Sequence, residues 1–171
     1  MVSHLLGEFR RFRATGAEEF FSHIESLLEN EQVRKLDDFV QHYSCTRLRH
    51  SLDVAYMSFS IARFLGWDSR SVARAGLLHD LFLYDRHAAD YTGKRHLRGH
   101  PAIALENARR VCSLNAVEED IIRKHMWLVT LMPPRYKEAY IVTFVDKYCA
   151  LREVMRSASP RARRAARASA A

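Results

Sequence analysis

Glycine, proline and cysteine are scarce in this sequence, and long apolar runs are lacking. The chain has 171 residues, of which six are glycine, four proline and three cysteine. No apolar run approaches the roughly 18 residues that a membrane-spanning helix needs. The cysteines are odd in number and widely spaced, which argues against a disulfide framework or a thiolate metal cluster. Membrane-spanning and disulfide-stabilised classes are therefore excluded.

The N-terminal residues also lack the order of a secretory signal, because a short apolar patch is followed by arginines. We therefore expect a cytoplasmic protein with no membrane partner. Hydrophobic residues make up 48% and charged residues 27% of the chain, as in ordinary soluble proteins. A chain of this size buries about two-thirds of its unfolded surface in one core, so we expect a single domain.

The net charge of +7 is concentrated near the C-terminus. Residues 157–171 contain four arginines and no acidic residue. Alanine, serine and arginine without large apolar residues do not build a core. We interpret residues 1–156 as one folded domain and residues 157–171 as a flexible, solvated tail. The alternative is a tail that contacts nucleic acid or an acidic partner, and we expect no other contact with nucleic acid.

Apolar residues recur at three- and four-residue intervals, which predicts an all-α fold. We expect a compact bundle of about six to seven helices. Gly66 is expected to end one helix, and Asp68 to cap the next. Pro101 fits the first turn of a helix whose N-cap is His100, after a loop over residues 83–99. The predicted helices span residues 17–29, 31–42, 46–65, 69–80, 101–112, 117–126 and 135–155.

Four of these helices carry an ionisable residue where a core residue is expected. His79, for example, shares one helix face with Val72, Ala75 and Gly76. A single histidine on an apolar face is usually a packed core residue, but four helices with one such residue each suggest a shared site. The four residues are His50, His79, His125 and Asp146.

Asp80 and Asp146 are predicted to lie among apolar neighbours, where an unpaired carboxylate is expensive. Neutral histidines do not balance such charges, whereas a divalent metal ion does. Imidazole and carboxylate ligands suit iron, manganese, zinc, cobalt or nickel. Adjacent helical side chains diverge by about 100°, so His79 and Asp80 reach one ion only at the helix edge. The second oxygen of Asp80 is then free for another ion, with His100 and His125 as remaining ligands.

The series His50, the dipeptide His79–Asp80 and Asp146 resembles the HD superfamily of metal-dependent phosphohydrolases. His100 and His125 look like the additional histidines of its dinuclear branch. The stretches "RLRHSLDVA" around His50 and "HMWLVTLMPPRYKEAYIVTFVDKYCA" from His125 onward are similar in layout to symmetrical dinucleoside tetraphosphate hydrolases. The resemblance covers residues 42–155.

The resemblance implies an HD-domain fold with a metal site between central helices and two ions, most often iron or manganese. His50, His79, Asp80 and Asp146 would hold the first ion. Asp80, His100 and His125 would hold the second. The implied activity is cleavage of a phosphoester or phosphoanhydride bond by a metal-activated water, and the expected substrate is a small nucleotide.

Two residues are candidates for direct catalytic roles, Asp80 as the shared ligand and Arg47 three residues before His50. Arg47 would contact a substrate phosphate or support the ligands from outside, and a surface ion pair is its alternative. Lys124 and Lys147 are further substrate-binding candidates, with solvated charges as the alternative. Many family members have a lysine that contacts phosphate where this chain has Leu83, so the substrate class of the family does not transfer directly to this chain. Other candidates for phosphate or base contacts are Arg86, Lys94 and Trp127.

Two other functions remain open. Some HD-fold proteins with a similar ligand set are di-iron oxygenases that cleave carbon bonds with O₂. The short interval between His125 and Asp146 favours the hydrolase layout by analogy. The second alternative is a non-catalytic, regulatory HD domain whose basic tail binds a partner.

Overall fold

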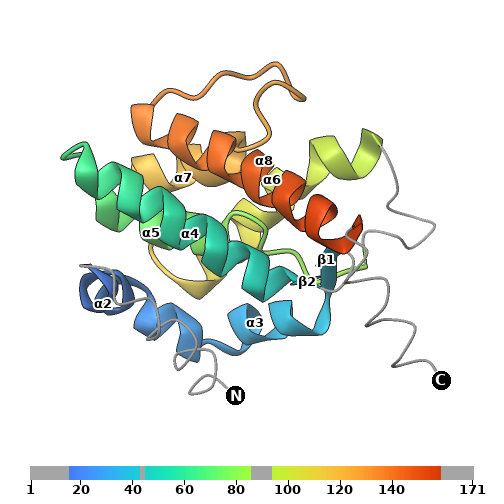
Figure 1. Cartoon of the computed structure of the whole chain (residues 1–171), viewed down its shortest axis with the longest axis horizontal. Helices are drawn as coiled ribbons and strands as arrows, with labels where there is room; N and C mark the ends of the chain where they lie inside the picture. Colours follow the sequence, from blue (N-terminus) through green and yellow to red (C-terminus); the bar gives the residue numbers. More distant parts are fainter. Residues whose placement is uncertain (1–15, 43–44, 86–93, 159–171) are drawn as a thin grey trace.

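A computed structural model of the chain describes residues 16–42, 45–85 and 94–158 (Figure 1). Within these ranges the structure contains seven α-helices, one short 3-10 helix and one two-stranded antiparallel sheet, which confirms the all-α fold class. The elements are α2 (Ala17–Glu29), α3 (Glu31–Arg34), η1 (Lys35–Asp38), β1 (Val40–His42), β2 (Cys45–Thr46), α4 (Arg47–Phe64), α5 (Ser69–Leu78), α6 (Lys94–Val111), α7 (Ala116–Lys124) and α8 (Lys137–Ala158).

Helix α4 lies at the centre of the bundle and packs against both α5 and α8 (Figure 1). Its apolar residues are buried on more than one face, including Leu52, Val54 and Phe59. The Thr46 hydroxyl caps its N-terminus by accepting a hydrogen bond from the Arg49 amide. A central helix that is apolar on several faces places its polar members, such as His50, inside the protein.

Helices α4 and α5 approach each other closely because of Gly76. A Cβ atom at this position would lie 2.8 Å from the Cα atom of Ala55, so any larger side chain would push the helices apart. Asp68 caps the start of α5 as expected, by accepting from the Ser71 amide. The close crossing brings His79, the residue after α5, beside the helix that carries His50.

The helix expected over residues 31–42 is wrong in its second half. Helix α3 ends at Arg34, and the chain continues through η1 into the strand β1. The hydroxyl of Thr46 donates to Asp37, and the amide of Arg47 donates to the carbonyl of Phe39. These contacts with residues distant along the chain replace the local hydrogen bonds that a longer helix would have made.

The expected start of the helix near residue 101 is also wrong, because α6 already begins at Lys94. His100 is therefore inside the helix rather than its N-cap, and the loop predicted over 83–99 is helical from Lys94 onward. Pro101 costs the helix one backbone hydrogen bond. The burial of His100, Ala104 and Leu105 on the same face offsets that loss.

The predicted tail lies almost wholly outside the described residues, since α8 continues to Ala158 and residues 159–171 follow it. The division into residues 1–156 and 157–171 stays a prediction. Among the helices of the described ranges, none combines the length and apolar character that crossing a membrane requires.

Candidate metal centre

Six side chains from five segments meet inside the bundle as two adjoining sets. We call His50, His79 and Asp146 the first ligand group, and Asp80, His100 and His125 the second ligand group. In each group the potential ligand atoms all lie within 4.8 Å of one another. The structure thus brings together all six residues proposed as metal ligands, although their positions in the sequence span nearly 100 residues.

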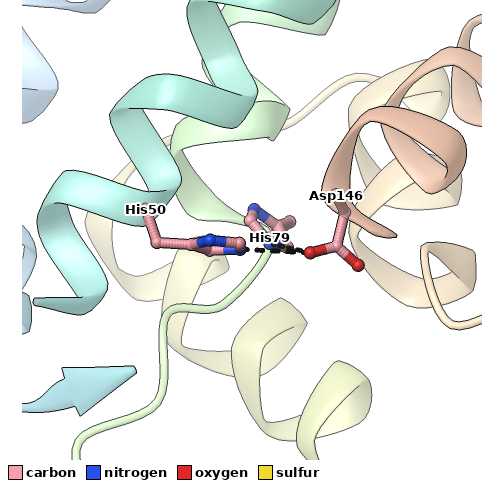
Figure 2. A group of neighbouring side chains, drawn as sticks. All are labelled: His50, His79 and Asp146. Carbon is pink, nitrogen blue, oxygen red and sulfur yellow. Dashed lines mark hydrogen bonds and ion pairs between the residues drawn. The ribbon is translucent and has the colours of Figure 1, made fainter. Parts of the chain in front are cut away.

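The first ligand group joins α4, the end of α5 and α8 (Figure 2). Nε2 of His50 lies 3.1 Å and Nε2 of His79 lies 3.7 Å from Oδ1 of Asp146. His50 and His79 are completely buried. Two imidazole nitrogens and one carboxylate oxygen therefore converge on a single small volume.

The second ligand group joins Asp80 to α6 and to the end of α7. Oδ1 of Asp80 lies 3.3 Å from Nε2 of His100 and 3.5 Å from Nε2 of His125. The two Nε2 atoms are 2.9 Å apart. The two groups adjoin at Asp80, whose Oδ2 is 3.7 Å from Nε2 of His79. One carboxylate therefore lies between the two groups, as a bridging ligand would.

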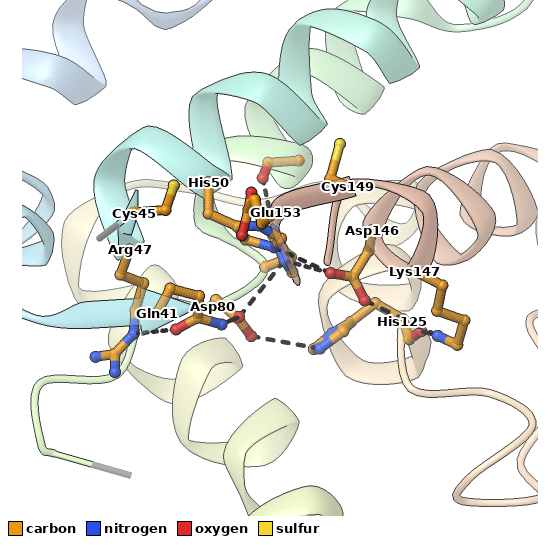
Figure 3. Close-up of polar contacts among 12 residues, drawn as sticks. Gln41, Cys45, Arg47, His50, Asp80, His125, Asp146, Lys147, Cys149 and Glu153 are labelled. Carbon is orange, nitrogen blue, oxygen red and sulfur yellow. Dashed lines mark hydrogen bonds and ion pairs between the residues drawn. The ribbon is translucent and has the colours of Figure 1, made fainter. Parts of the chain in front are cut away.

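In three of the imidazoles, Nδ1, the ring nitrogen that faces away from the ligand group, has a partner in the protein. Nδ1 of His79 donates to the carbonyl of Gly76 at 2.7 Å, and Nδ1 of His125 donates to the carbonyl of Ile122 at 2.8 Å. Because a carbonyl only accepts, Nδ1 carries the proton in both bonds, and the rings are oriented with Nε2 directed into the centre. Nδ1 of His50 lies 2.9 Å from Oε1 of Glu153, which gives a carboxylate partner of the kind that orients metal-binding histidines (Figure 3).

The acidic groups remain ionised despite their burial. Burial would raise the pKa of Asp80, but the neighbouring His79, His100 and His125 together hold that pKa well below its usual range. Burial would likewise raise the pKa of Asp146, but the neighbouring His50 and His79 lower it instead. The centre therefore presents two negative charges to any cation, on buried Asp80 and on Asp146, whose side chain is 13% exposed.

The imidazoles respond to these charges in different directions. Burial disfavours the protonated form of His50, but hydrogen bonds to Asp146 and Glu153 outweigh it and raise the pKa to about 10. The pKa of His79 is also raised, because Asp80 and Asp146 outweigh burial. Burial lowers the pKa of His125, and the neighbouring His100 and His79 oppose its protonation further. The second ligand group thus contains an imidazole that is held neutral, as a metal ligand must be.

Two buried atoms of the two ligand groups make no hydrogen bond within the described residues, namely Nε2 of His79 and Oδ1 of Asp80. An orphaned buried polar atom is costly and calls for an explanation. Both atoms point toward the convergence of the other ligands, where a cation would satisfy them. The donor set of imidazole nitrogen and carboxylate oxygen, without a thiolate, fits a divalent transition metal.

Sequence reasoning missed two residues of this centre, Glu153 and Gln41. Glu153 lies seven residues after Asp146 on α8, so the helical repeat places both residues on the same face, and this spacing could have indicated Glu153. Gln41 donates from its amide to Oδ2 of Asp80 at 2.6 Å. No spacing in the sequence indicated Gln41, because its position beside Asp80 depends on the reversal of the chain between β1 and β2.

Arg47 lies beside the centre but is completely buried. Its Nε donates to Gln41, and its two terminal nitrogens donate to the carbonyls of Phe82 and Tyr84. Its guanidinium also lies 3.6 Å from the centre of the Phe82 ring. Of the roles expected for Arg47, this geometry favours support of the ligands from outside over contact with a substrate phosphate or a surface ion pair.

The other candidates for substrate contacts lie at different distances from the centre. Lys147 donates to the carbonyls of His125 and Thr143, and its Nζ is 3.9 Å from Oδ2 of Asp146. Lys124 instead pairs with Asp120 at 2.7 Å.

Trp127 packs edge-on against Tyr140, and Leu83 packs against the core. Arg86 lies outside the described residues, and Lys94 is described only as the first residue of α6. These four residues therefore add no observed contact with the ligand groups.

The fold is an all-α bundle that holds two adjoining groups of histidine and aspartate side chains, each of which could hold a metal ion. Residues 47–151 match the HD domain family, and the chain belongs to that family. HD domains are in general metal-dependent phosphohydrolases, so membership agrees with the ligand geometry.

Two curated relatives carry the same printed name. The chain is similar to "Ribonuclease Y" of Aquifex aeolicus, with 33% identity over 114 residues, which is 67% of this chain and 18% of that protein. It is also similar to "Ribonuclease Y" of Rhodopirellula baltica, with 34% identity over 95 residues, or 56% of this chain and 17% of that protein. The chain thus spans less than a fifth of the length of these relatives. No solved structure matches the chain.

Proposed function

We propose that this protein is a metal-dependent phosphohydrolase that cleaves a phosphoester or phosphoanhydride bond of a nucleotide. The observation that carries the proposal is the joining of the two ligand groups through the adjacent residues His79 and Asp80. A single buried carboxylate with one oxygen toward each group is the arrangement that a pair of ions requires. We further propose two ions, with iron or manganese preferred over zinc, cobalt or nickel.

Divalent ions, when bound, supply Lewis acidity toward phosphate oxygens and activate water. The residues of the chain provide the rest. His79 and His125 direct their Nε2 atoms into the centre because their Nδ1 atoms are held by backbone carbonyls. Asp80 and Asp146 keep their negative charge. Lys147, whose side chain is 32% exposed, places a cation at the edge of the first ligand group, where a substrate phosphate would approach.

The substrate class is proposed from two kinds of likeness. The layout around His50 and from His125 to Asp146 resembles that of symmetrical dinucleoside tetraphosphate hydrolases, which favours a phosphoanhydride. The printed name of the two relatives refers to RNA, which favours a phosphodiester. We favour the small nucleotide, with no nucleic acid bound except through the basic residues 157–171, and propose a cytoplasmic location without a membrane partner.

The test is a hydrolysis screen of protein supplied with iron or manganese. The panel contains dinucleoside polyphosphates, cyclic dinucleotides, phosphomonoesters and a short single-stranded RNA. We expect phosphate or nucleotide release from a small nucleotide, lost in Asp80→Asn and retained in Asp38→Asn, a matched change at an exposed residue of η1.

Three results would contradict the proposal. Cleavage of the RNA alone would show that the substrate is RNA, to which the name of the relatives refers, and not a small nucleotide. Consumption of an organic substrate only when O₂ is present, with a mixed-valent iron signal, would indicate an oxygenase. Retention of ions without turnover of any substrate in the panel would favour a regulatory domain.

A further inference from the structure

Gln41 connects a buried arginine to the carboxylate shared by the two ligand groups. Its side chain is 6% exposed. Its amide nitrogen donates to Oδ2 of Asp80 at 2.6 Å, and its amide oxygen accepts from Nε of Arg47 at 2.9 Å (Figure 3). A chain of two hydrogen bonds therefore runs from Arg47 on α4 through β1 to Asp80.

The amide of Gln41 has only one orientation that satisfies both neighbours. A guanidinium only donates and an ionised carboxylate only accepts, so the oxygen must face Arg47 and the nitrogen Asp80. Arg47 is itself immobilised, because its terminal nitrogens donate to the carbonyls of Phe82 and Tyr84. Its guanidinium also stacks on the rings of Phe39 and Phe82, at 5.0 Å and 3.6 Å from their centres.

The hydrogen bond from Gln41 determines which oxygen of Asp80 is available to the second ligand group. With Oδ2 held beside His79, Oδ1 is directed at Nε2 of His100 and of His125. Asp80 is the one carboxylate in that group, whereas the first group has its own carboxylate, Asp146. Rotation of the Asp80 carboxylate would therefore harm the second group more than the first.

We propose that Gln41 is a positioning residue, which orients the Asp80 carboxylate for the ion of the second ligand group, and that Arg47 anchors it. The proposal rests on the proposed function insofar as that function requires two ions. It assigns Gln41 no contact with substrate. It also gives buried Arg47 a role that depends on its fixed set of donors rather than on its charge toward a phosphate.

The test compares metal binding by the wild-type protein and by Gln41→Leu. Both proteins are titrated with Mn²⁺ by calorimetry, and bound metal is counted after dialysis. Removal of a partner that orients a metal ligand typically lowers affinity about 10- to 100-fold. We expect a loss of this size for one equivalent of Mn²⁺ and little change for the other. The metal-free proteins are compared by thermal unfolding.

A second variant separates donation of the hydrogen bond from the shape of the side chain. Gln41→Glu keeps the size of the side chain and an acceptor for Arg47, but its ionised carboxylate cannot donate to Asp80. We expect Gln41→Glu to lose the same equivalent of Mn²⁺ as Gln41→Leu, although it preserves the packing. Gln32→Leu, the same change at the other glutamine of the chain, should bind as the wild type does.

The outcomes distinguish this proposal from the proposed function. Two equivalents bound with wild-type affinity by both Gln41 variants would overturn the positioning role and leave the dinuclear centre intact. Equal weakening of both equivalents would also overturn it, because Gln41 would then support the whole site. A wild-type protein that binds no ion would refute the proposed centre itself. If Gln41→Leu does not fold, Gln41→Glu decides between these results.

Discussion

The first and second ligand groups adjoin at Asp80 but differ in the negative charge around them. In the first group, Asp146 lies 3.1 Å and Glu153 lies 2.9 Å from the two nitrogens of His50. In the second group, two imidazoles face each other at 2.9 Å across the carboxylate of Asp80. A cation in the first group therefore meets more compensating charge. We infer that the first group binds its ion more tightly and that the second depends on Asp80.

The groups also differ in what fixes their side chains. Glu153 and the Gly76 carbonyl hold the imidazoles of the first group, both through contacts on the packed helices α5 and α8. The second group relies on the Ile122 carbonyl and on the hydrogen bond from Gln41 to Asp80. A centre built in this way should lose its second ion before its first. Three substitutions test this order, and a fourth tests where the substrate approaches.

The largest effect is expected for Asp146→Asn, which removes the carboxylate that is a member of the first group only. We expect the affinity for the ion of that group to fall by more than about 100-fold, beyond the usual effect of an outer partner. Turnover should be lost as well. Metal counting after dialysis and a hydrolysis assay check this, with Asp38→Asn as the exposed control. Full retention of both ions would show that Asp146 is not a ligand.

His100→Ala should remove one ion and spare the other. His100 contacts Asp80 and His125 but no member of the first ligand group in the contacts described above. We expect about 100-fold weaker binding of one equivalent, with the other within about twofold of wild type. Calorimetric titration with Mn²⁺ gives both values. The control is His23→Ala on α2. Loss of both equivalents of Mn²⁺ in His100→Ala would show that the two ligand groups do not bind their ions separately.

Glu153→Gln should weaken the first group by a smaller factor. Glutamine still offers an oxygen to Nδ1 of His50, but it no longer carries the negative charge that makes the imidazole a better ligand. We expect about tenfold weaker binding of the tighter equivalent. The variant is titrated beside Glu25→Gln, a change at an exposed glutamate of α2. If Glu153→Gln instead weakens the more weakly bound equivalent, the first ligand group is the one with the lower affinity, contrary to our inference.

The smallest effect is expected for Lys147→Met, which removes the cation beside the first group. The ammonium is partly exposed and therefore screened, so we expect KM to rise about twofold to fivefold. The value of kcat should change little, because no ligand is altered. Lys124→Met is the matched control, since Lys124 pairs with Asp120. A larger effect in Lys124→Met would place the incoming phosphate near the second group.

Much of the fold and of the candidate centre could be predicted from helical periodicity. Spacings of three and four residues gave α4, α5 and α7 nearly at their observed bounds. The same spacing placed His50, His79, His125 and Asp146 among core residues, where the structure has them. This worked because His50 and Asp146 lie on regular helices, and His79 and His125 keep helical backbone angles directly after α5 and α7, so spacing in the sequence decides which side is buried.

The parts that could not be predicted depend on contacts between distant segments. The change from α3 to η1 and β1 follows from bonds that Thr46 and Arg47 make to residues 37 and 39. No local pattern marks these bonds. The same reversal places Gln41 beside Asp80, so the residue was missed for the same reason. Pro101 misled for a different reason, because a helix start is its usual place, whereas α6 begins seven residues earlier, at Lys94.

His79 and His125 each follow directly after the last residue of a helix, and each bonds to a carbonyl three residues earlier. The final turns of α5 and α7 must stay wound for the imidazoles to face inward. Fraying of either turn would swing its imidazole away, so ion occupancy and terminal winding are thermodynamically linked. Backbone amides in those two turns should therefore exchange with deuterated solvent more slowly once ions are supplied.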